Sequence, residues 1–187
     1  KRWLAAQSDD KLGMAANVAE NIIALGGKPA LIGLAGCDSR ADTLRTKLNE
    51  DGIDDKFLVA DPQRPTIHKT RIMAQSIAQQ QHVVRVDYEK IFPANDAIFE
   101  QICLNVAENL HYSQALIVED YGKGIITQSL MNEIREICHK FNRPLFIDPN
   151  PRHPAEWYQG ATLITPNVAE AAQMAGIEPD SEDAIMQ

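Results

Sequence analysis

Two polar residues, Asn167 and Glu170, stand where an apolar run gives way to a helical pattern. Pro166 disfavours the α conformation for the residue before it, so the run 163–165 is predicted to end as a strand. Asn167 is a good N-cap, and Glu170 completes a capping box. One interpretation is that the pair only caps a helix. The other is that the helix N-terminus binds a phosphate and that the acid beside it holds a magnesium ion, because free N–H groups favour anions and Mg²⁺ prefers oxygen ligands.

Two more polar loops follow apolar runs earlier in the chain. The run 115–118 leads into Asp120 and Lys123, and the run 145–147 leads into Asp148 and Arg152. A helical pattern over 127–141 joins the two runs, which is the spacing of a parallel crossover. Parallel strands end at one edge of a sheet, where open α/β proteins bind their ligands. The three loops therefore predict a single site.

Near the start of the chain, the stretch 13–27 shows helical spacing, with either Leu25 or Ile23 as the last residue of its inner face and glycines that end it. Its small first residues would allow close approach to another backbone or to a ligand. Asn17 is a polar exception on this face. It either bonds to the backbone at the helix start or binds a pair of sugar hydroxyls.

A charged hairpin is predicted from two extended segments, 66–73 and 83–86. Alternation places Lys69 and Arg71 on one face of the first segment, and Arg85 and Asp87 on one face of the second. Such an insertion between helical units is typical of a small lid over a site. The alternative is a solvated edge hairpin whose charges deter aggregation.

The elements that must position these loops follow from periodicity. Short strands are predicted at 30–34 and 57–59, and a helix from 96 onward buries Ile98, Ile102, Val106 and Leu110 at every fourth position. The continuous apolar run 115–118 predicts a strand covered on both faces. Trp157 and Tyr158 are expected to pack under the loop after 148.

Composition limits the class of protein. The 187 residues are 44% hydrophobic, enough for a real core in one domain, and the net charge of −8 argues against nucleic acid and anionic membranes as partners. No apolar run approaches the length of about 20 residues that spans a bilayer. Cys103 and Cys138 fall in apolar patterns and are expected to serve packing, which makes the cytoplasm the default location.

Together these features resemble the ribokinase-like (PfkB) carbohydrate kinases, and among them the heptose-7-phosphate kinase domain of bifunctional ADP-heptose synthases. The likeness covers nearly the whole chain and rests on an ordered set of motifs: Gly13-Met14-Ala15-Ala16-Asn17, Thr66-Ile67-His68-Lys69-Thr70-Arg71, Arg85-Val86-Asp87, Asp120-Tyr121-Gly122-Lys123-Gly124, Ile147-Asp148-Pro149 and Thr165-Pro166-Asn167-x-x-Glu170. It implies a three-layer α/β/α domain over 1–187 with a mainly parallel sheet and a small β lid inserted at about 57–87.

The resemblance also implies ATP-dependent phosphorylation of a sugar or sugar phosphate, with Mg²⁺, in the synthesis of ADP-heptose for lipopolysaccharide. Phosphoryl transfer needs mainly positioning and charge neutralisation, which a magnesium ion and a few cations supply. Lid hairpins of this family further imply a homodimer. By this likeness, the substrate-binding residues are Gly13, Asn17, Lys69, Arg71, Asp120 and Lys123. The ATP- and phosphate-binding residues are Asp148, Asn150, Arg152, Asn167 and Glu170, with Glu170 holding magnesium through water.

The chain departs from the family's pattern in several places. Met14 stands where the family has a second glycine, so its side chain could alter or block entry of the sugar. Asn150 stands where the heptose kinases carry lysine, and Arg152 is not an equivalent replacement. The family's Gly-Ala-Gly-Asp motif with the catalytic base is absent before Gln187, and the first strand is absent before Lys1. We therefore expect a domain incomplete at both ends and inactive alone, the alternative being an inactive sugar- or nucleotide-binding module.

Overall fold

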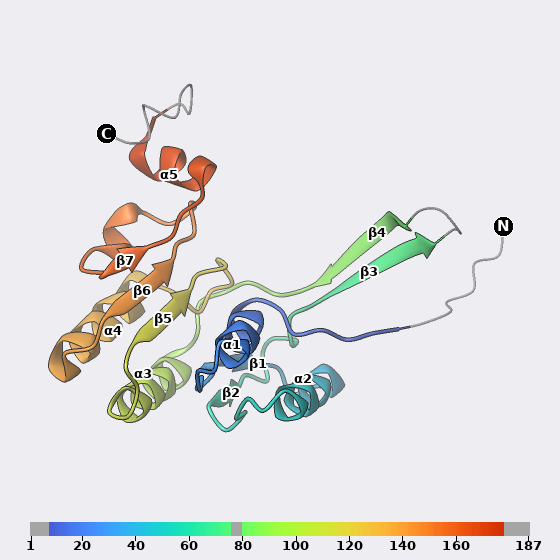
Figure 1. The fold of residues 1–187 in the computed structure, drawn as a ribbon, viewed down its shortest axis with the longest axis horizontal. Coiled ribbons are helices and arrows are strands. Elements are labelled where there is room, and N and C mark those ends of the chain that lie inside the picture. Colours follow the sequence, from blue (N-terminus) through green and yellow to red (C-terminus); the bar gives the residue numbers. More distant parts are fainter. Residues whose placement is uncertain (1–7, 76–79, 178–187) are drawn as a thin grey trace.

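The computed structural model describes residues 8–75 and 80–177, and its strands form three sheets (Figure 1). Strand β1 pairs with β2 in parallel, β3 pairs with β4 in antiparallel, and β6 lies between β5 and β7 in a parallel sheet. The strands are β1 (Gly33–Ala35), β2 (Leu58–Ala60), β3 (His68–Gln75), β4 (Gln80–Tyr88), β5 (Leu116–Glu119), β6 (Leu145–Asp148) and β7 (Leu163–Ile164). The helices are α1 (Ala15–Ala24), α2 (Ser39–Glu50), α3 (Asp96–Leu110), α4 (Gln128–Phe141) and α5 (Val168–Ala175), with a 3₁₀ helix, η1 (Ala155–Tyr158).

The larger core lies between the β5–β6–β7 sheet and the helices α3 and α4. The predicted spacing of four in α3 is confirmed, since Ile98, Ile102, Val106 and Leu110 are all buried. Helix α4 begins after Thr127, whose side chain accepts a hydrogen bond from the Leu130 N–H, and it ends at a left-handed residue, Asn142. These caps fix where the crossover between β5 and β6 begins and ends.

The opposite face of this sheet differs from the prediction that the run 115–118 forms a strand covered on both sides. Ile117 and Leu163 are 42% and 55% exposed, and both are in register with Phe146. Val118 and Ile147, which alternate with them, are buried against the helices. An apolar run shows that a strand is hydrophobic on both faces, but it does not show that the described chain supplies a cover for each face.

A smaller core joins α1 and α2 to the β1–β2 pair, with Leu48 fully buried. Asp38 caps α2 by accepting from the Ala41 N–H at 3.0 Å, and Gly52 follows its end with φ 77°. Of the two residues predicted to end the inner face of α1, Ile23 packs against this core, whereas Leu25 follows the last helical residue, Ala24, and is 88% exposed. The apolar pattern continued one residue past the helix, and Gly26, at φ 84°, turns the chain away there.

The β3–β4 hairpin, called the lid below, extends away from the helices and the other sheets (Figure 1). Its boundary differs from the expected insert at about 57–87, because β2 pairs with β1 and so belongs with α1 and α2. In the register of the lid, Lys69 faces Asp87 and Arg71 faces Arg85. The face predicted for each pair within its own strand is confirmed, and the register places both pairs on the same side of the hairpin. Within 8–75 and 80–177, no helix is both long and apolar enough to cross a membrane.

Candidate active site

The carboxyl ends of β5, β6 and β7 lie side by side, as the sequence predicted. The Asp120 N–H donates to the Asp148 carbonyl at 3.0 Å, and the Thr165 N–H donates to the Ile147 carbonyl at 3.0 Å. The Thr165 hydroxyl also donates to the Asp148 carboxylate at 3.2 Å. Backbone pairing therefore brings the loops 120–124, 148–154 and 165–167 to one edge of the sheet.

Asp120 is the fixed centre of this edge, with a side chain that is 0% exposed. Its carboxylate accepts from the Gly122 N–H at 2.9 Å and from the Tyr158 hydroxyl at 2.7 Å, and it lies 2.7 Å from His153 Nδ1. Burial and the neighbouring Asp120 raise the pKa of Tyr158, which holds its hydroxyl as a donor. Asp120 thus binds the loops to one another, and its contact with a substrate stays a prediction.

Asn150 is nearly buried within the same set of loops. The Asn150 N–H donates to the Tyr158 hydroxyl at 3.0 Å, and its side-chain oxygen accepts from the Arg152 N–H at 3.0 Å. Gly122 has φ 63°, and a Cβ there would lie 2.6 Å from Asn150 Nδ2. The close fit of the two loops therefore requires glycine at 122. Arg152, the other predicted phosphate-binding residue of this loop, is exposed.

Tyr158 and His153 were not identified as site residues from the sequence. Packing of Tyr158 under the loop is confirmed, since it is 3% exposed. Its hydrogen bond to Asp120 spans 38 residues of sequence, and that of His153 spans 33. No local pattern marks a pairing over such a distance.

A second carboxylate, Glu119, stands in register beside Asp148 at this edge. Burial and then the charge of Asp148 raise the pKa of Glu119, while burial and Glu119 raise the pKa of Tyr121 to about 12. Two adjacent acids make the edge electronegative, a setting that suits a hard cation. The described residues contain no group of three or more His, Cys, Asp or Glu side chains arranged for a metal. A cation here would take its remaining ligands from water or a bound phosphate.

The capping box at α5 is confirmed. Asn167 accepts from the Glu170 N–H at 3.0 Å, and Glu170 accepts from the Asn167 N–H at 2.8 Å. Asn167 and Glu170 therefore do cap the helix. Binding of a phosphate or a magnesium ion at this helix start stays a prediction.

Lys69 of the lid and Lys123 of the loop after β5 meet at one carboxylate, Glu89. Lys123 Nζ lies 2.7 Å and Lys69 Nζ 3.8 Å from Glu89 Oε2, and Lys69 also pairs with Asp87 at 3.0 Å. The structure thus brings together two of the predicted substrate-binding cations. Arg71 stands farther along the lid, opposite Arg85, and is exposed.

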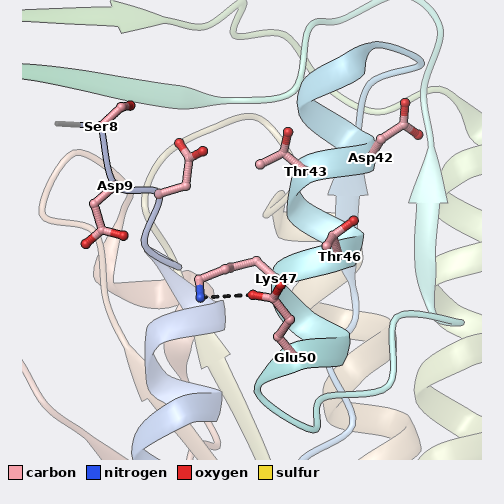
Figure 2. Close-up of a pocket in the computed structure, with 8 residues that line it drawn as sticks. Ser8, Asp9, Asp42, Thr43, Thr46, Lys47 and Glu50 are labelled. Carbon is pink, nitrogen blue, oxygen red and sulfur yellow. Dashed lines mark hydrogen bonds and ion pairs between the residues drawn. The ribbon is translucent and has the colours of Figure 1, made fainter. Parts of the chain in front are cut away.

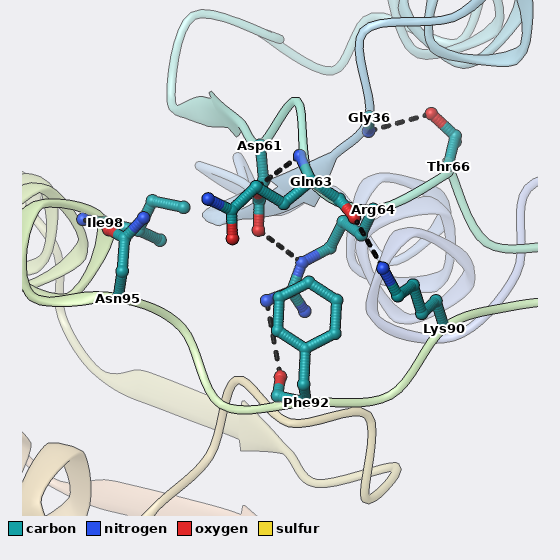
Figure 3. A network of polar contacts seen from close by, with 9 residues as sticks. All are labelled: Gly36, Asp61, Gln63, Arg64, Thr66, Lys90, Phe92, Asn95 and Ile98. Carbon is teal, nitrogen blue, oxygen red and sulfur yellow. Dashed lines mark hydrogen bonds and ion pairs between the residues drawn. The ribbon is translucent and has the colours of Figure 1, made fainter.

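The base of the lid is held by Arg64 (Figure 3). Arg64 Nε donates to Asp61 Oδ2 at 2.5 Å in a buried ion pair, its guanidinium lies 4.2 Å from the centroid of the Phe92 ring, and Nη2 donates to the Phe92 carbonyl at 3.3 Å. A Cβ on Gly124, at φ 82°, would lie 2.1 Å from the Phe92 carbonyl oxygen. The returning limb of the lid is therefore fixed between Arg64 and the loop that carries Lys123.

The first predicted motif adopts an unusual backbone. Met14 has φ 57° and ψ −138°, a conformation that favours glycine. Gly13 and Asn17 are exposed, and the Asn17 N–H donates to the Met14 carbonyl at 3.1 Å. In the described part of the chain no hydrogen bond joins the Asn17 side chain to the other predicted site residues, so its role stays a prediction.

A surface hollow of about 450 Å³ lies elsewhere, between the segment 8–10 and α2 (Figure 2). Acids dominate its lining, and Lys47 is paired with Glu50 at 3.2 Å. The lining residues are Ser8, Asp9, Asp10, Asp42, Thr43, Thr46, Lys47 and Glu50. Its charge opposes phosphorylated ligands, and it holds no residue predicted from the sequence.

The sequence of this chain is similar to those of known carbohydrate kinases. A model of the pfkB family of carbohydrate kinases matches residues 8–187. The bifunctional protein HldE of Granulibacter bethesdensis is 39% identical over 177 residues, which are 94% of this chain and 35% of that protein. HldE of Rhodopseudomonas palustris strain BisA53 is 35% identical over 177 residues, 95% of this chain and 36% of that protein. The chain thus spans about a third of the length of these relatives.

Solved structures share the fold at low sequence identity. The tetrameric inhibited form of phosphofructokinase-2 from Escherichia coli superposes with a TM-score of 0.68 at 16% identity, covering 98% of this chain and 61% of that one. The Burkholderia thailandensis nucleoside kinase in complex with inosine gives 0.59 at 18% identity, covering 99% and 57%. The architecture is therefore ribokinase-like, as the sequence predicted.

Proposed function

This chain belongs to the pfkB family of carbohydrate kinases, and we propose from this premise that it forms part of an enzyme that phosphorylates a sugar phosphate with ATP. The observation that carries the proposal is the shared edge of β5, β6 and β7, where loops bearing acids, amides and a lysine meet. The acceptor in this proposal is heptose 7-phosphate and the setting is ADP-heptose synthesis, as the resemblance of the motifs to heptose-7-phosphate kinase domains implies.

The predicted residues divide into two groups within this proposal. Lys69, Lys123 and Arg71 provide positive charge for the phosphate of the acceptor, and Asn17 binds hydroxyls of the sugar. The side of the nucleotide is formed by Asp148, Asn150, Arg152, Asn167 and Glu170. Asp120 holds the first loop in place through its buried hydrogen bonds.

Magnesium fits the chemistry of the donors at this edge. Glu119 and Asp148 stand in register, and the raised pKa of Glu119 reflects burial and the negative charge beside it. Glu170, at the start of α5, adds a carboxylate for a water-mediated contact. When bound, the ion would neutralise charge on the transferred phosphoryl group. The chain's own residues orient the phosphates. Asn167 and the N–H groups at the start of α5 bind the nucleotide phosphates, and Lys69 and Lys123 neutralise the phosphate of the acceptor.

A test of this function compares Glu170→Gln with Glu136→Gln, an exposed acid on α4. Glutamine preserves a capping box but removes the charge, so stability should change by less than about 0.5 kcal/mol. We expect the magnesium requirement to rise and ATP-dependent phosphorylation of heptose 7-phosphate to fall at least about 10-fold, as loss of one charge-stabilising group does. The assay is run on this chain and on the longest natural product of its gene.

Three outcomes distinguish the alternatives. Full activity with an unchanged magnesium requirement in Glu170→Gln would reduce Glu170 to a helix cap. Calorimetric binding of sugar phosphate without turnover in either sample would support the alternative of an inactive binding module. If neither binding nor turnover is detected, the proposed substrate class is rejected.

The lid also supports a homodimer in this proposal. One of its faces is apolar and exposed: Ile72, Val84 and Val86 are 49%, 45% and 37% exposed, and Tyr88 stacks on His68. A two-stranded hairpin alone is only marginally stable, and a second copy packed on this face would bury it. Sedimentation of Val84→Lys against the unchanged chain tests this, since loss of a dimer only in the variant is the expected result.

A further inference from the structure

Glu89 stands between the two lysines that we assign to the acceptor's phosphate. Its Oε2 lies 2.7 Å from Lys123 Nζ and 3.8 Å from Lys69 Nζ. The three side chains come from β3, from the limb that follows β4, and from the loop after β5. They are 26%, 23% and 17% exposed for Lys69, Glu89 and Lys123, so each charge is largely shielded from solvent.

The contact is an approach of charges without a well-directed hydrogen bond. Glu89 Oε2 is buried, and no described donor meets it with hydrogen-bond geometry, despite the short distance to Lys123. Asp87, by contrast, accepts directed hydrogen bonds from Lys69 at 3.0 Å and from Arg85 at 2.9 Å. Glu89 is therefore held by its charge attraction to the two lysines and not by directed hydrogen bonds, and another anion between the lysines could supply the same attraction.

The backbone allows Glu89 to leave without disturbing the base of the lid. Three residues further on, Phe92 is held by Arg64 (Figure 3). Gly124 packs closely against the backbone of Phe92. On the outgoing limb, the Gly36 N–H donates to the Thr66 hydroxyl at 2.9 Å, and the Thr66 N–H donates to Asp38 at 2.9 Å. The short limbs 67 and 89–91 lie between these anchors and the lid, and Glu89 is on one of them.

We propose that Glu89 is an internal anion that occupies the phosphate subsite between Lys69 and Lys123 in the free protein and is exchanged for the phosphate of the acceptor. This inference rests on the proposed function. A phosphate dianion carries more charge than a carboxylate and offers three acceptor oxygens, so it satisfies both lysines better than Glu89 does. Exchange removes the contact between the limb 89–91 and Lys123 of the loop after β5.

The experiment titrates inorganic phosphate into the full chain by calorimetry at pH 7.5 and constant ionic strength. We expect Glu89→Gln to bind phosphate about 3- to 5-fold more tightly than the unchanged chain, because a competing partly exposed ion pair is gone. Glu89→Asp, which shortens the acid but keeps its charge, should give an intermediate affinity. Lys69→Met and Lys123→Met should each weaken binding, and Glu136→Gln serves as the matched control.

The outcomes separate the two proposals. Unchanged or weaker binding in Glu89→Gln, with weaker binding in both lysine variants, leaves the phosphate subsite in place and overturns the exchange. If neither lysine variant changes the affinity for phosphate, both the subsite and the exchange are overturned. Binding detectable only in Glu89→Gln supports the exchange. Thermal unfolding of each variant is measured beside it, and an affinity is compared only between variants that unfold within a few degrees of each other.

Discussion

At the scale of single residues, Met14 combines a demanding backbone with a position in a predicted site. A non-glycine residue at φ 57° carries strain of about 1–3 kcal/mol. The resemblance to the family implies a glycine here, and methionine in its place adds both backbone strain and side-chain volume near Asn17. The strain is testable by substitution of this one residue.

We predict that Met14→Gly increases the free energy of unfolding by about 1 kcal/mol, since relief of strain outweighs the greater freedom of glycine in the unfolded chain. Met14→Ala keeps a Cβ and should bring no gain. Urea denaturation of both variants checks this. Equal destabilisation by glycine and alanine would mean that the Met14 side chain matters more than its backbone.

Tyr158 gives a second prediction at this scale. Tyr158→Phe removes the hydroxyl between Asp120 and the Asn150 N–H and leaves a fully buried carboxylate with one fewer donor. We expect a loss of about 1–3 kcal/mol in the free energy of unfolding. Tyr112→Phe, at a side chain that is 83% exposed, should lie within about 0.5 kcal/mol of the unchanged chain. Urea denaturation measures both, and equal effects would contradict the role of the buried hydroxyl.

Among the elements, the contact between the loop after β5 and the limb after β4 has a matched control elsewhere in the chain. Gly124 and Gly26 have φ of 82° and 84°, but an added Cβ meets the Phe92 carbonyl oxygen at 2.1 Å in the first and nothing within 4 Å in the second. Gly26→Ala should therefore report backbone strain alone, at about 1 kcal/mol.

We predict that Gly124→Ala costs at least about 2 kcal/mol more than Gly26→Ala, because the loop and the limb must separate. Thermal unfolding of the two variants gives the difference. Similar melting temperatures would show that the limb yields easily and that Phe92 is no anchor for the lid.

The elements also show what the sequence could predict. Helix α3 was recognised from its spacing of four, and the capping box of α5 from Asn167 and Glu170, because each signal lies within a few residues. The shared edge of β5, β6 and β7 followed from a general rule about parallel strands. The ion pairs of Glu89 and the Arg64–Phe92 contact could not be predicted, since their partners lie 20 to 34 residues apart and no periodicity connects them.

For the whole molecule, acid stability follows from several aspartates with lowered pKa values. A hydrogen bond from Arg45 lowers the pKa of Asp55, hydrogen bonds from Lys69 and Arg85 lower that of Asp87, and at Asp61 burial opposes but bonds from Gln63 and Arg64 prevail. A group whose pKa is lowered by folding stabilises the protein at any pH above its pKa in the unfolded chain. That contribution is lost as the pH falls through its pKa in the folded protein.

We therefore predict that the melting temperature is nearly constant from pH 7 to about pH 5 and drops below about pH 4, near the ordinary aspartate value. Asp55→Asn should melt lower at neutral pH, and its difference from the unchanged chain should shrink as the pH approaches 3. Calorimetric scans across this range measure both curves. A difference independent of pH would show that Asp55 contributes no ionised contact.

The position of β6 between two partners has a consequence for how the sheet opens. In the described chain β6 is the one strand of its sheet with neighbours on both sides, whereas β7 is two residues long and lies at an edge. In heavy water, amide protons of β6 should accordingly be replaced by deuterium last, and the amides at the Thr165 end should be replaced early. In a local opening, β6 with Asp148 at its end would then stay folded while the neighbouring loop 165–167, which leads to α5, unfolds.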